Sequence, residues 1–221
     1  MRDKEVSFIG TLDFPGEEIF TLIPSRSSFG YRARFVIMKA LFKKLPCLEK
    51  KEMSKKIVLK GKVHKFGNDV NTDYIISGRY KFKSLNMKEL STHIFEDIRP
   101  GFFKEISQGD FIVAGENFGC GSSREQAPLV IKESGISAVL SKSFARIFFR
   151  NCINVGLLAI ECSTEKIELS DVLEINLEEG IIKNLTRKKI LKFKKLPGIM
   201  IQILKAGGLA PYLKKKKKFD V

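Results

Sequence analysis

The stretch Gly115-Glu116-Asn117-Phe118-Gly119-Cys120-Gly121-Ser122-Ser123-Arg124-Glu125, here called the serine loop, is the segment around which the rest of the chain is organised. The apolar run 111–114 precedes it, and 126–134 follows with the spacing of apolar residues that is typical of a helix. The serine loop is therefore expected to join a buried strand to a helix.

The small residues of the serine loop indicate a binding turn. Gly119 and Gly121 allow positive φ and a close approach of the backbone to a ligand. We expect Ser122 and Ser123 at the start of the following helix, where unpaired N–H groups favour anions, including a serine alkoxide. Pro128 fits the first turn of that helix because its missing N–H needs no partner there.

Two familiar glycine signatures do not match this loop. A phosphate-binding P-loop requires a lysine that the loop lacks, and a dinucleotide-binding turn requires a glycine where Arg124 stands. A tight turn capped by serine is the simpler alternative. However, three glycines, two adjacent hydroxyls and an arginine exceed what capping alone requires.

The serine loop resembles a known family. Residues 117–128, Asn-Phe-Gly-Cys-Gly-Ser-Ser-Arg-Glu-Gln-Ala-Pro, are similar to the serine loop of the swivelling domain of the aconitase superfamily, in the form found in 3-isopropylmalate dehydratase small subunits. Residues 71–76 and 143–151, the latter followed by 153–157, also match that family. The resemblance runs from about Ile57 to Leu213 and implies an α/β fold, the aconitase-like swivelling β/β/α domain.

The resemblance also implies a function. It predicts the small subunit of a two-subunit hydro-lyase of leucine biosynthesis, which isomerises 2-isopropylmalate and 3-isopropylmalate by dehydration and rehydration. Ser122 would be the base, the N–H groups of Ser123 and Arg124 would hold its alkoxide, and Arg124 would bind a carboxylate of a small dicarboxylate or hydroxy acid in bidentate fashion. Ser123 would also contact the substrate, and Thr72 and Asp73 would support the site. A homoaconitase-like or other dicarboxylate hydratase is the alternative within the superfamily.

Phe82 is the residue expected to select the substrate. Tyr80-Lys81-Phe82-Lys83 occupies the specificity loop of the family, in which homoaconitase-like relatives resemble Tyr-Leu-Arg-Thr. An aromatic ring in the third position favours a branched alkyl group over a carboxylate, which would be desolvated without a partner. In an extended loop, Lys81 and Lys83 would point away from Phe82. Isopropylmalate is therefore preferred to homoaconitate.

The cysteines favour a reducing, cytoplasmic compartment and do not indicate a cluster on this chain. Cys47, Cys120, Cys152 and Cys162 form no C-x-x-C pair and no disulfide framework. Three of them lie in the matched region, which is the number that aconitase-type enzymes use to hold a [4Fe–4S] cluster, but ferredoxin-like spacing is absent. The resemblance places the cluster on a separate large subunit, so no metal or cofactor is expected here. Cys120 and Cys152 are expected to be small packing residues.

The formal charge of +15 would suggest nucleic-acid binding if the charge lay on the globular part of the chain. Residues 57–182 have a net charge of −2, whereas 183–221 have +12. A basic RNA-binding module is therefore the disfavoured alternative of another class, and neither a nucleic acid nor a membrane is an expected partner. No apolar run approaches the ~20 residues of a membrane-spanning helix.

We divide the chain into three parts. Residues 1–52 match nothing in the family and are interpreted as a misassigned start or a disordered extension, with an organelle transit peptide as the alternative. Residues 53–213 are the swivelling domain, and a chain that begins at Met53 is expected to fold and function. Residues 214–221 are a Lys-rich tail, of which Lys214 to Lys218 are expected to be a frayed, solvated end.

A Ser-His-Asp hydrolase does not fit the sequence. The only histidines, His64 and His93, do not adjoin the serine loop in the sequence, and the G-x-S-x-G motif of α/β hydrolases is absent. If Ser122 is catalytic, helix-terminal N–H groups and a nearby arginine must make its hydroxyl acidic.

The remaining elements follow from periodicity. We expect a half-buried strand over 57–66, a rigid loop without regular structure over 67–73, and strands over 136–140 and 157–161. A hairpin is expected from 172–177 and 181–185. Expected helices cover 86–95, 100–106, 144–154 and 197–206, and Gly207-Gly208 ends the last one.

Overall fold

The computed structural model describes residues 58–81 and 86–216 of the chain. Residues 1–52 and Phe82 lie outside the described residues, so the predictions made for them stay predictions, as do the outer domain boundaries.

Within these ranges, seven strands form one mixed sheet in the order β4-β3-β2-β1-β5-β6-β7. The strands β1 to β4 pair in parallel, whereas β1, β5, β6 and β7 pair antiparallel. Their bounds are β1 Val58–Lys65, β2 Phe111–Val113, β3 Ala138–Ser141, β4 Leu158–Glu161, β5 Val172–Asn176, β6 Ile181–Asn184 and β7 Lys189–Lys192.

The central strand β1 has two partners along its length. Its residues Val58 to Lys62 pair with β5, and Val63 to Lys65 pair with β2. Only Val63 and His64 of β1 are buried, whereas every residue of β2 and β3 is buried, as parallel strands between two layers require. The predicted half-buried strand is confirmed.

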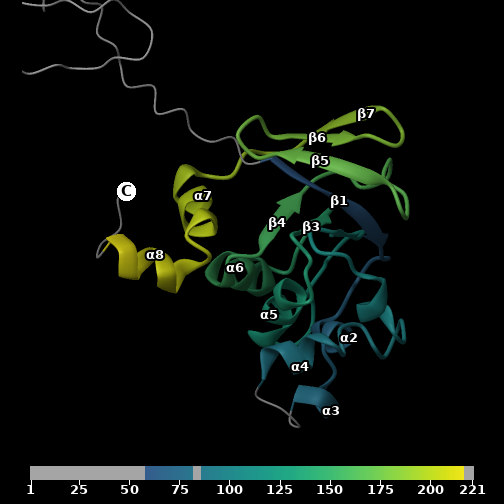
Figure 1. Cartoon of the computed structure of the whole chain (residues 1–221), viewed down its shortest axis with the longest axis vertical. Helices are drawn as coiled ribbons and strands as arrows, with labels where there is room; N and C mark the ends of the chain where they lie inside the picture. Colours follow the sequence, from purple (N-terminus) through teal and green to yellow (C-terminus); the bar gives the residue numbers. More distant parts are fainter. Residues whose placement is uncertain (1–57, 82–85, 217–221) are drawn as a thin grey trace, which may run out of the picture. The chain divides into compact units, whose positions relative to one another are not determined.

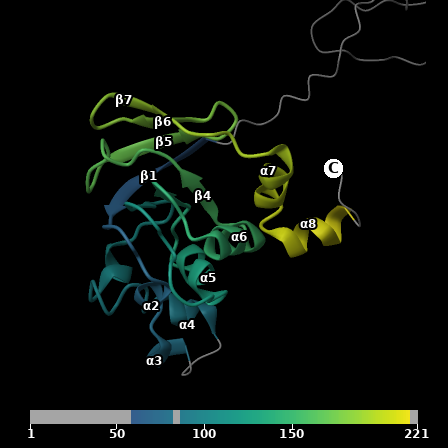
Figure 2. The same cartoon turned by 180° about the vertical axis from the view of Figure 1, so that it is seen from behind.

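Helices cover one face of the parallel strands. They are α2 Thr72–Ile75, α3 Gly78–Lys81, α4 Met87–Ser91, the 3-10 helix η1 Phe102–Glu105, α5 Gln126–Glu133, α6 Arg146–Val155, α7 Gly198–Lys205 and α8 Leu209–Lys216. In Figures 1 and 2, α5 and α6 lie beside each other, and α2 to α4 lie at the end away from β5 to β7.

Two apolar clusters lie on opposite faces of the parallel strands. Ile112, Val139 and Ala159 pack with side chains of the helices, among them Val130 and Phe148. The alternate strand residues, such as Phe111, Val113 and Leu140, instead pack with Leu173, Ile175 and Ile182 of the antiparallel strands. The layers are therefore antiparallel strands, parallel strands and helices, which confirms the predicted β/β/α fold.

The structure corrects four local predictions. Residues 72–75 form a helical turn because the amide oxygen of Asn71 accepts the N–H of Asp73 at 2.9 Å, so this segment is not an irregular loop. Residues 78–81 also form a helical turn and not an extended segment. Strand β7 was not predicted, and neither was helix α8, which includes Lys214 to Lys216 of the expected frayed end.

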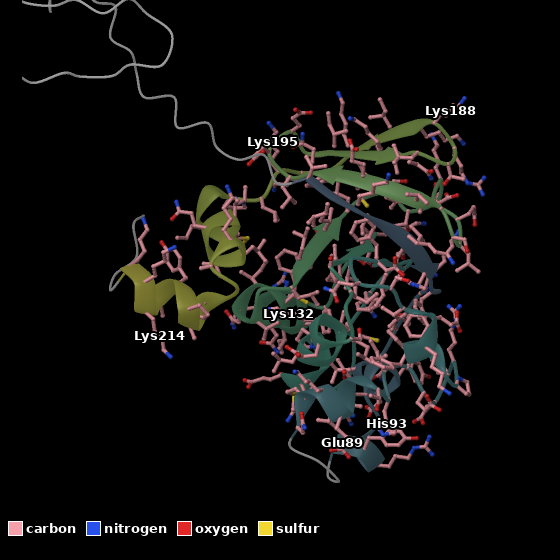
Figure 3. The ribbon with its side chains drawn as sticks, viewed as in Figure 1. Glu89, His93, Lys132, Lys188, Lys195 and Lys214 are labelled. Atoms are coloured by element: carbon pink, nitrogen blue, oxygen red, sulfur yellow. The ribbon has the colours of Figure 1, made fainter. Side chains whose placement is uncertain are left out.

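The C-terminal helices are held to the core by a lysine of α5. The ammonium of Lys132 donates to the carbonyl of Val155 at 2.7 Å and to that of Gly207 at 3.1 Å. Figure 3 shows Lys132 beside α5 and α6. Ile203 of α7 and Tyr212 of α8 form a third buried cluster with Ile153. The end of α6 and the turn between α7 and α8 are therefore fixed to α5.

Candidate active site

The serine loop is held on both sides by backbone hydrogen bonds. On one side the N–H of Phe118 donates to Ser143 at 3.0 Å, and the N–H of Ala145 donates back to Phe118 at 2.9 Å. On the other side the N–H of Gly119 donates to Val70 at 2.8 Å, and the N–H of Thr72 donates to Cys120 at 2.9 Å. The loop between β2 and α5 is thus fixed by the segment before α6 and by the segment that enters α2.

Gly119 and Gly121 both adopt positive φ, +80° and +88°, as the sequence predicted. A Cβ on Gly119 would lie 2.1 Å from the ring of Phe148, and a Cβ on Gly121 would lie 2.3 Å from the amide oxygen of Asn71. The glycines therefore let α6 and the 70–72 segment approach the loop. Our expectation gave a different reason, namely that larger residues would hold the substrate away.

The two serines do not lie at a helix terminus. Helix α5 begins at Gln126, with Glu125 in the cap position, and Ser122 and Ser123 are exposed residues before it. The prediction that the two serines start this helix is therefore wrong, because hydrogen bonds to distant segments hold the loop and the helix begins later. Pro128 does lie in the first turn, as expected.

A guanidinium group lies next to the hydroxyl of Ser122. The Nε–H of Arg124 donates to Oγ of Ser122 at 3.2 Å, and the buried hydroxyl of Thr72 donates to the carbonyl oxygen of Ser122 at 2.8 Å. Of the two groups expected to make this hydroxyl acidic, the structure places the arginine in contact. Thr72 contacts the backbone of the serine and so fixes its position.

Arg124 is itself fixed by two further contacts. Its Nη1 donates to the carbonyl of Ile76 at 2.6 Å, and its Nη2 forms an ion pair with the carboxylate of Asp73. An arginine has five N–H donors. The contacts with Ser122, Ile76 and Asp73 therefore leave two donors of Arg124 for a ligand.

These residues line a cavity of about 320 Å³ between the serine loop and the first turns of α6. The lining from the loop side comprises Thr72, Gly119, Gly121, Ser122, Ser123 and Arg124, and the lining from α6 and the residue before it comprises Ala145, Arg146, Ile147, Phe148 and Asn151. The described lining thus contains two arginines and no acidic residue. Such a cavity suits a small anion.

Sequence reasoning missed the contribution of α6. Arg146, Ile147 and Asn151 belong to the 143–151 block that matched the family, but that block gave no role to them. The four-residue spacing of Arg146 and Arg150 was the available signal. It cannot show which of the two faces the serine loop, and the structure places only Arg146 in this cavity.

Phe82 and Lys83 lie outside the described residues, but the segment before them borders the site. A Cβ on Gly78, the first residue of α3, would lie 3.9 Å from Nη2 of Arg124. Two residues later, Tyr80 stacks on His93 with ring centroids 4.0 Å apart and 7° between the planes. Figure 3 shows His93 at this end of the molecule, near Glu89.

The described cysteines and His64 do not line this cavity. Burial raises the pKa of Cys152 well above its ordinary value and that of Cys162 to about 12, so both remain thiols at neutral pH. Cys120 is half-buried, whereas Cys152 packs in the core as expected. His64 is buried on β1, 2.9 Å from the carboxylate of Asp110. No group of three His, Cys, Asp or Glu side chains in the described ranges is placed to hold a metal ion.

Fold and loop define the class of protein. A family model of the aconitase C-terminal domain matches residues 76–165, which include the serine loop and most of the residues that line the cavity. None of the helices in the described part of the chain has the length and apolar character needed to cross a membrane.

Curated relatives give the particular family. The chain is 55% identical over 161 residues to the isopropylmalate/citramalate isomerase small subunit of Methanocaldococcus jannaschii, covering 72% of this chain and 95% of that protein. It is 52% identical to a 3-isopropylmalate dehydratase small subunit of Archaeoglobus fulgidus, covering 70% and 96%. A crystal structure of 3-isopropylmalate dehydratase from M. jannaschii superposes with a TM-score of 0.70 at 50% identity, covering 73% and 96%. The chain belongs to the 3-isopropylmalate dehydratase small-subunit family.

Proposed function

We propose that this chain is the small subunit of a two-subunit hydro-lyase that interconverts 2-isopropylmalate and 3-isopropylmalate by dehydration and rehydration. It acts with a cluster-binding large subunit and supplies the base and the groups that bind the substrate carboxylates. The relatives support this role, since they are small subunits named for isopropylmalate. A cytoplasmic location remains an expectation.

The contact between Ser122 and Arg124 carries the proposal. In the dehydration, Oγ of Ser122 takes the proton from the carbon next to a carboxylate, and the hydroxyl group leaves the adjacent carbon. Water then adds back with the hydroxyl on the other carbon, which completes the isomerisation. The guanidinium of Arg124, 3.2 Å from Oγ, stabilises the serine in its deprotonated form because it is a permanent cation.

The departing hydroxyl requires a second group that the described residues lining the cavity do not offer. The buried, protonated thiols of Cys152 and Cys162 do not fit a cluster. A [4Fe–4S] cluster on the large subunit would act as the Lewis acid for the hydroxyl.

Asp73 and Thr72 are positioning residues in this proposal. Asp73 holds Nη2 of the Arg124 guanidinium, while Nε of Arg124 faces Ser122. Thr72 fixes the carbonyl of the serine. Ser123, exposed in the same cavity, contributes a hydroxyl to the substrate. A base must lie about 3 Å from the proton it takes, so this rigidity matters for the rate.

The choice of isopropylmalate over homoaconitate rests on Phe82. This selection stays a prediction, supported by the position of Gly78 beside Arg124. The test compares kcat/KM for the two substrates before and after Phe82→Arg. A preference of the unmodified enzyme for homoaconitate, or no shift toward homoaconitate in the variant, would contradict it.

The function is tested by purifying the chain with its large subunit and following the ultraviolet absorbance of the unsaturated acid formed from isopropylmalate. We expect turnover by the assembled enzyme and none by this chain alone. Ser122→Ala should lower kcat about 10²- to 10⁴-fold with little change in assembly, as for the loss of a general base. The neighbouring Ser123→Ala serves as the comparison: because Ser123 contacts the substrate and is not the base, this variant should mainly raise KM and should lose much less kcat. Near-normal kcat for Ser122→Ala would remove it as the base.

A further inference from the structure

We propose that Arg146 is the second carboxylate-binding residue of this cavity and pairs with the substrate carboxylate that Arg124 does not hold. This inference deepens the proposed function and rests on it. It adds a residue from α6 to a site that the sequence assigned to the serine loop and the 72–73 segment.

The backbone of Arg146 is fixed relative to the serine loop. Arg146 is the first residue of α6, directly after the segment that exchanges hydrogen bonds with Phe118. Two residues later, the ring of Phe148 fills the space above Gly119, where a Cβ would lie 2.1 Å from it. The first turn of α6 therefore cannot move away from the loop without loss of this packing.

The side chain of Arg146 is available for a ligand. It is exposed, it lines the cavity, and within the described ranges it has neither a hydrogen bond nor an ion pair. The nearby basic residue Lys142, in contrast, is paired with Glu165 at 2.9 Å. Arg146 also lines a neighbouring cavity with the exposed Glu161, but the two form no ion pair.

The charge balance of the cavity supports this role. Arg124 has given three donors to protein groups and has two left, which is enough for one carboxylate. A malate-type substrate carries two carboxylates, and a second cation on this side of the cavity would offset the loss of hydration when the second carboxylate is buried. Among the described residues that line this cavity, Arg146 is the other cation. The first turn of α6 has no side-chain cap, so the positive end of that helix adds to the same field.

The chain offers a matched control for this assignment. Arg150 lies one turn further along α6 and is exposed like Arg146, but it lines the neighbouring cavity and not this one. Removing either charge changes the net charge of α6 equally. Only the loss of Arg146 should affect the carboxylate site.

The experiment compares Arg146→Gln, Arg146→Lys and Arg150→Gln, each assembled with the large subunit. We expect Arg146→Gln to raise KM for isopropylmalate about 10- to 100-fold, the range for losing a hydrogen bond to a charged group. Arg146→Lys should recover part of this loss, and Arg150→Gln should stay within about two-fold of the unmodified enzyme. Unchanged KM in Arg146→Gln, or an equal effect of Arg150→Gln, would overturn the assignment.

A calorimetric titration separates this inference from the proposed function. The assembled enzyme is titrated with isopropylmalate and with the monocarboxylate 2-hydroxyisocaproate. Arg146→Gln should weaken the dicarboxylate and leave the monocarboxylate unchanged, a selectivity that needs no turnover. Equal weakening of both acids, or of the affinity for the large subunit, would make Arg146 a structural or docking residue and sink the proposal. Lack of turnover by the unmodified enzyme would reject the proposed function alone.

Discussion

Replacing Gly119 with alanine should loosen the serine loop and lower stability. Gly119 has φ of +80°, and the ring of Phe148 occupies the space next to it. A Cβ added to residue 119 would lie only 2.1 Å from that ring. Two separate costs therefore arise, one from the backbone and one from packing. Because Phe148 lies in the first turn of α6, its displacement also moves the wall of the cavity.

The size of the effect can be worked out from these two costs. A left-handed conformation costs an alanine about 1–2 kcal/mol, and overpacking a filled core site costs about 1–3 kcal/mol. Gly119→Ala should therefore lower the free energy of unfolding by about 2–5 kcal/mol. Gly101 has φ of +75° with open space around it, so Gly101→Ala should lose only the backbone part, about 1–2 kcal/mol. Gly67 has neither constraint, and Gly67→Ala should lie within about 0.5 kcal/mol of the unmodified protein.

The assay is urea unfolding of the full chain, followed by circular dichroism, for the three variants under one set of conditions. The same variants are then assembled with the large subunit, and kcat is measured. We expect kcat to fall in Gly119→Ala, because this change displaces α6 and the cavity wall. We expect it to stay near that of the unmodified enzyme in the other two variants. If Gly119→Ala is no more destabilised than Gly101→Ala, the contact with Phe148 does not constrain the loop, and the reasoning is refuted.

Three further changes test other parts of the structure. Arg124→Lys should raise KM and lower kcat, each by about 10-fold or more. The reason is that an ammonium cannot contact Ser122, Asp73 and a substrate at once, as the planar guanidinium can. Unchanged kinetics would contradict this expectation. Burial raises the pKa of Asp171. Hydrogen bonds from the backbone N–H of Glu168 and from the side chains of Asn184 and Arg187 outweigh this effect and hold the pKa below its ordinary value of 3.8. The stability from Asp171 is thus present above that value and lost as the pH falls below it, so Asp171→Asn should be destabilised by about 3 kcal/mol at pH 7 and should flatten the acid limb of the stability curve. Lys132→Met should lower the free energy of unfolding by about 1–3 kcal/mol, because two carbonyls lose the ammonium that donates to them. Amide hydrogen exchange should speed up first in α7 and α8.

The framework of the fold was predictable from local patterns. Phe111 to Val113 is apolar throughout, the glycines follow it directly, and 126–133 has helical spacing, so the strand, the loop and the helix were all predicted. The start of α5 was not. Serine is a good cap residue, which placed the start of the helix at Ser122, but hydrogen bonds to residues distant in sequence hold the loop and the helix begins three residues later.

The candidate site shows the same division between local and tertiary information. Ser122 and Arg124 were predicted from the loop and are in contact. The ion pair of Arg124 with Asp73 and the approach of Arg146 depend on how three separate segments come together, and no local pattern contains that information. Strand β7 was missed because its lysines reduce the apolar signal. Figure 3 places Lys188 and Lys195 at its two ends, which suits an edge strand that must not pair with other chains.

The two partners of strand β1 have a consequence for the order of folding during synthesis. β1 leaves the ribosome before the other six strands of this sheet, and Val63 can pair as soon as Phe111 has been made. Lys62 must wait for Val172, which is synthesised after the whole parallel part of the sheet. Until then the nascent protein presents an unpaired strand edge, the feature that promotes aggregation. The exposed lysines Lys60 and Lys62 occupy that edge and would repel a second nascent chain.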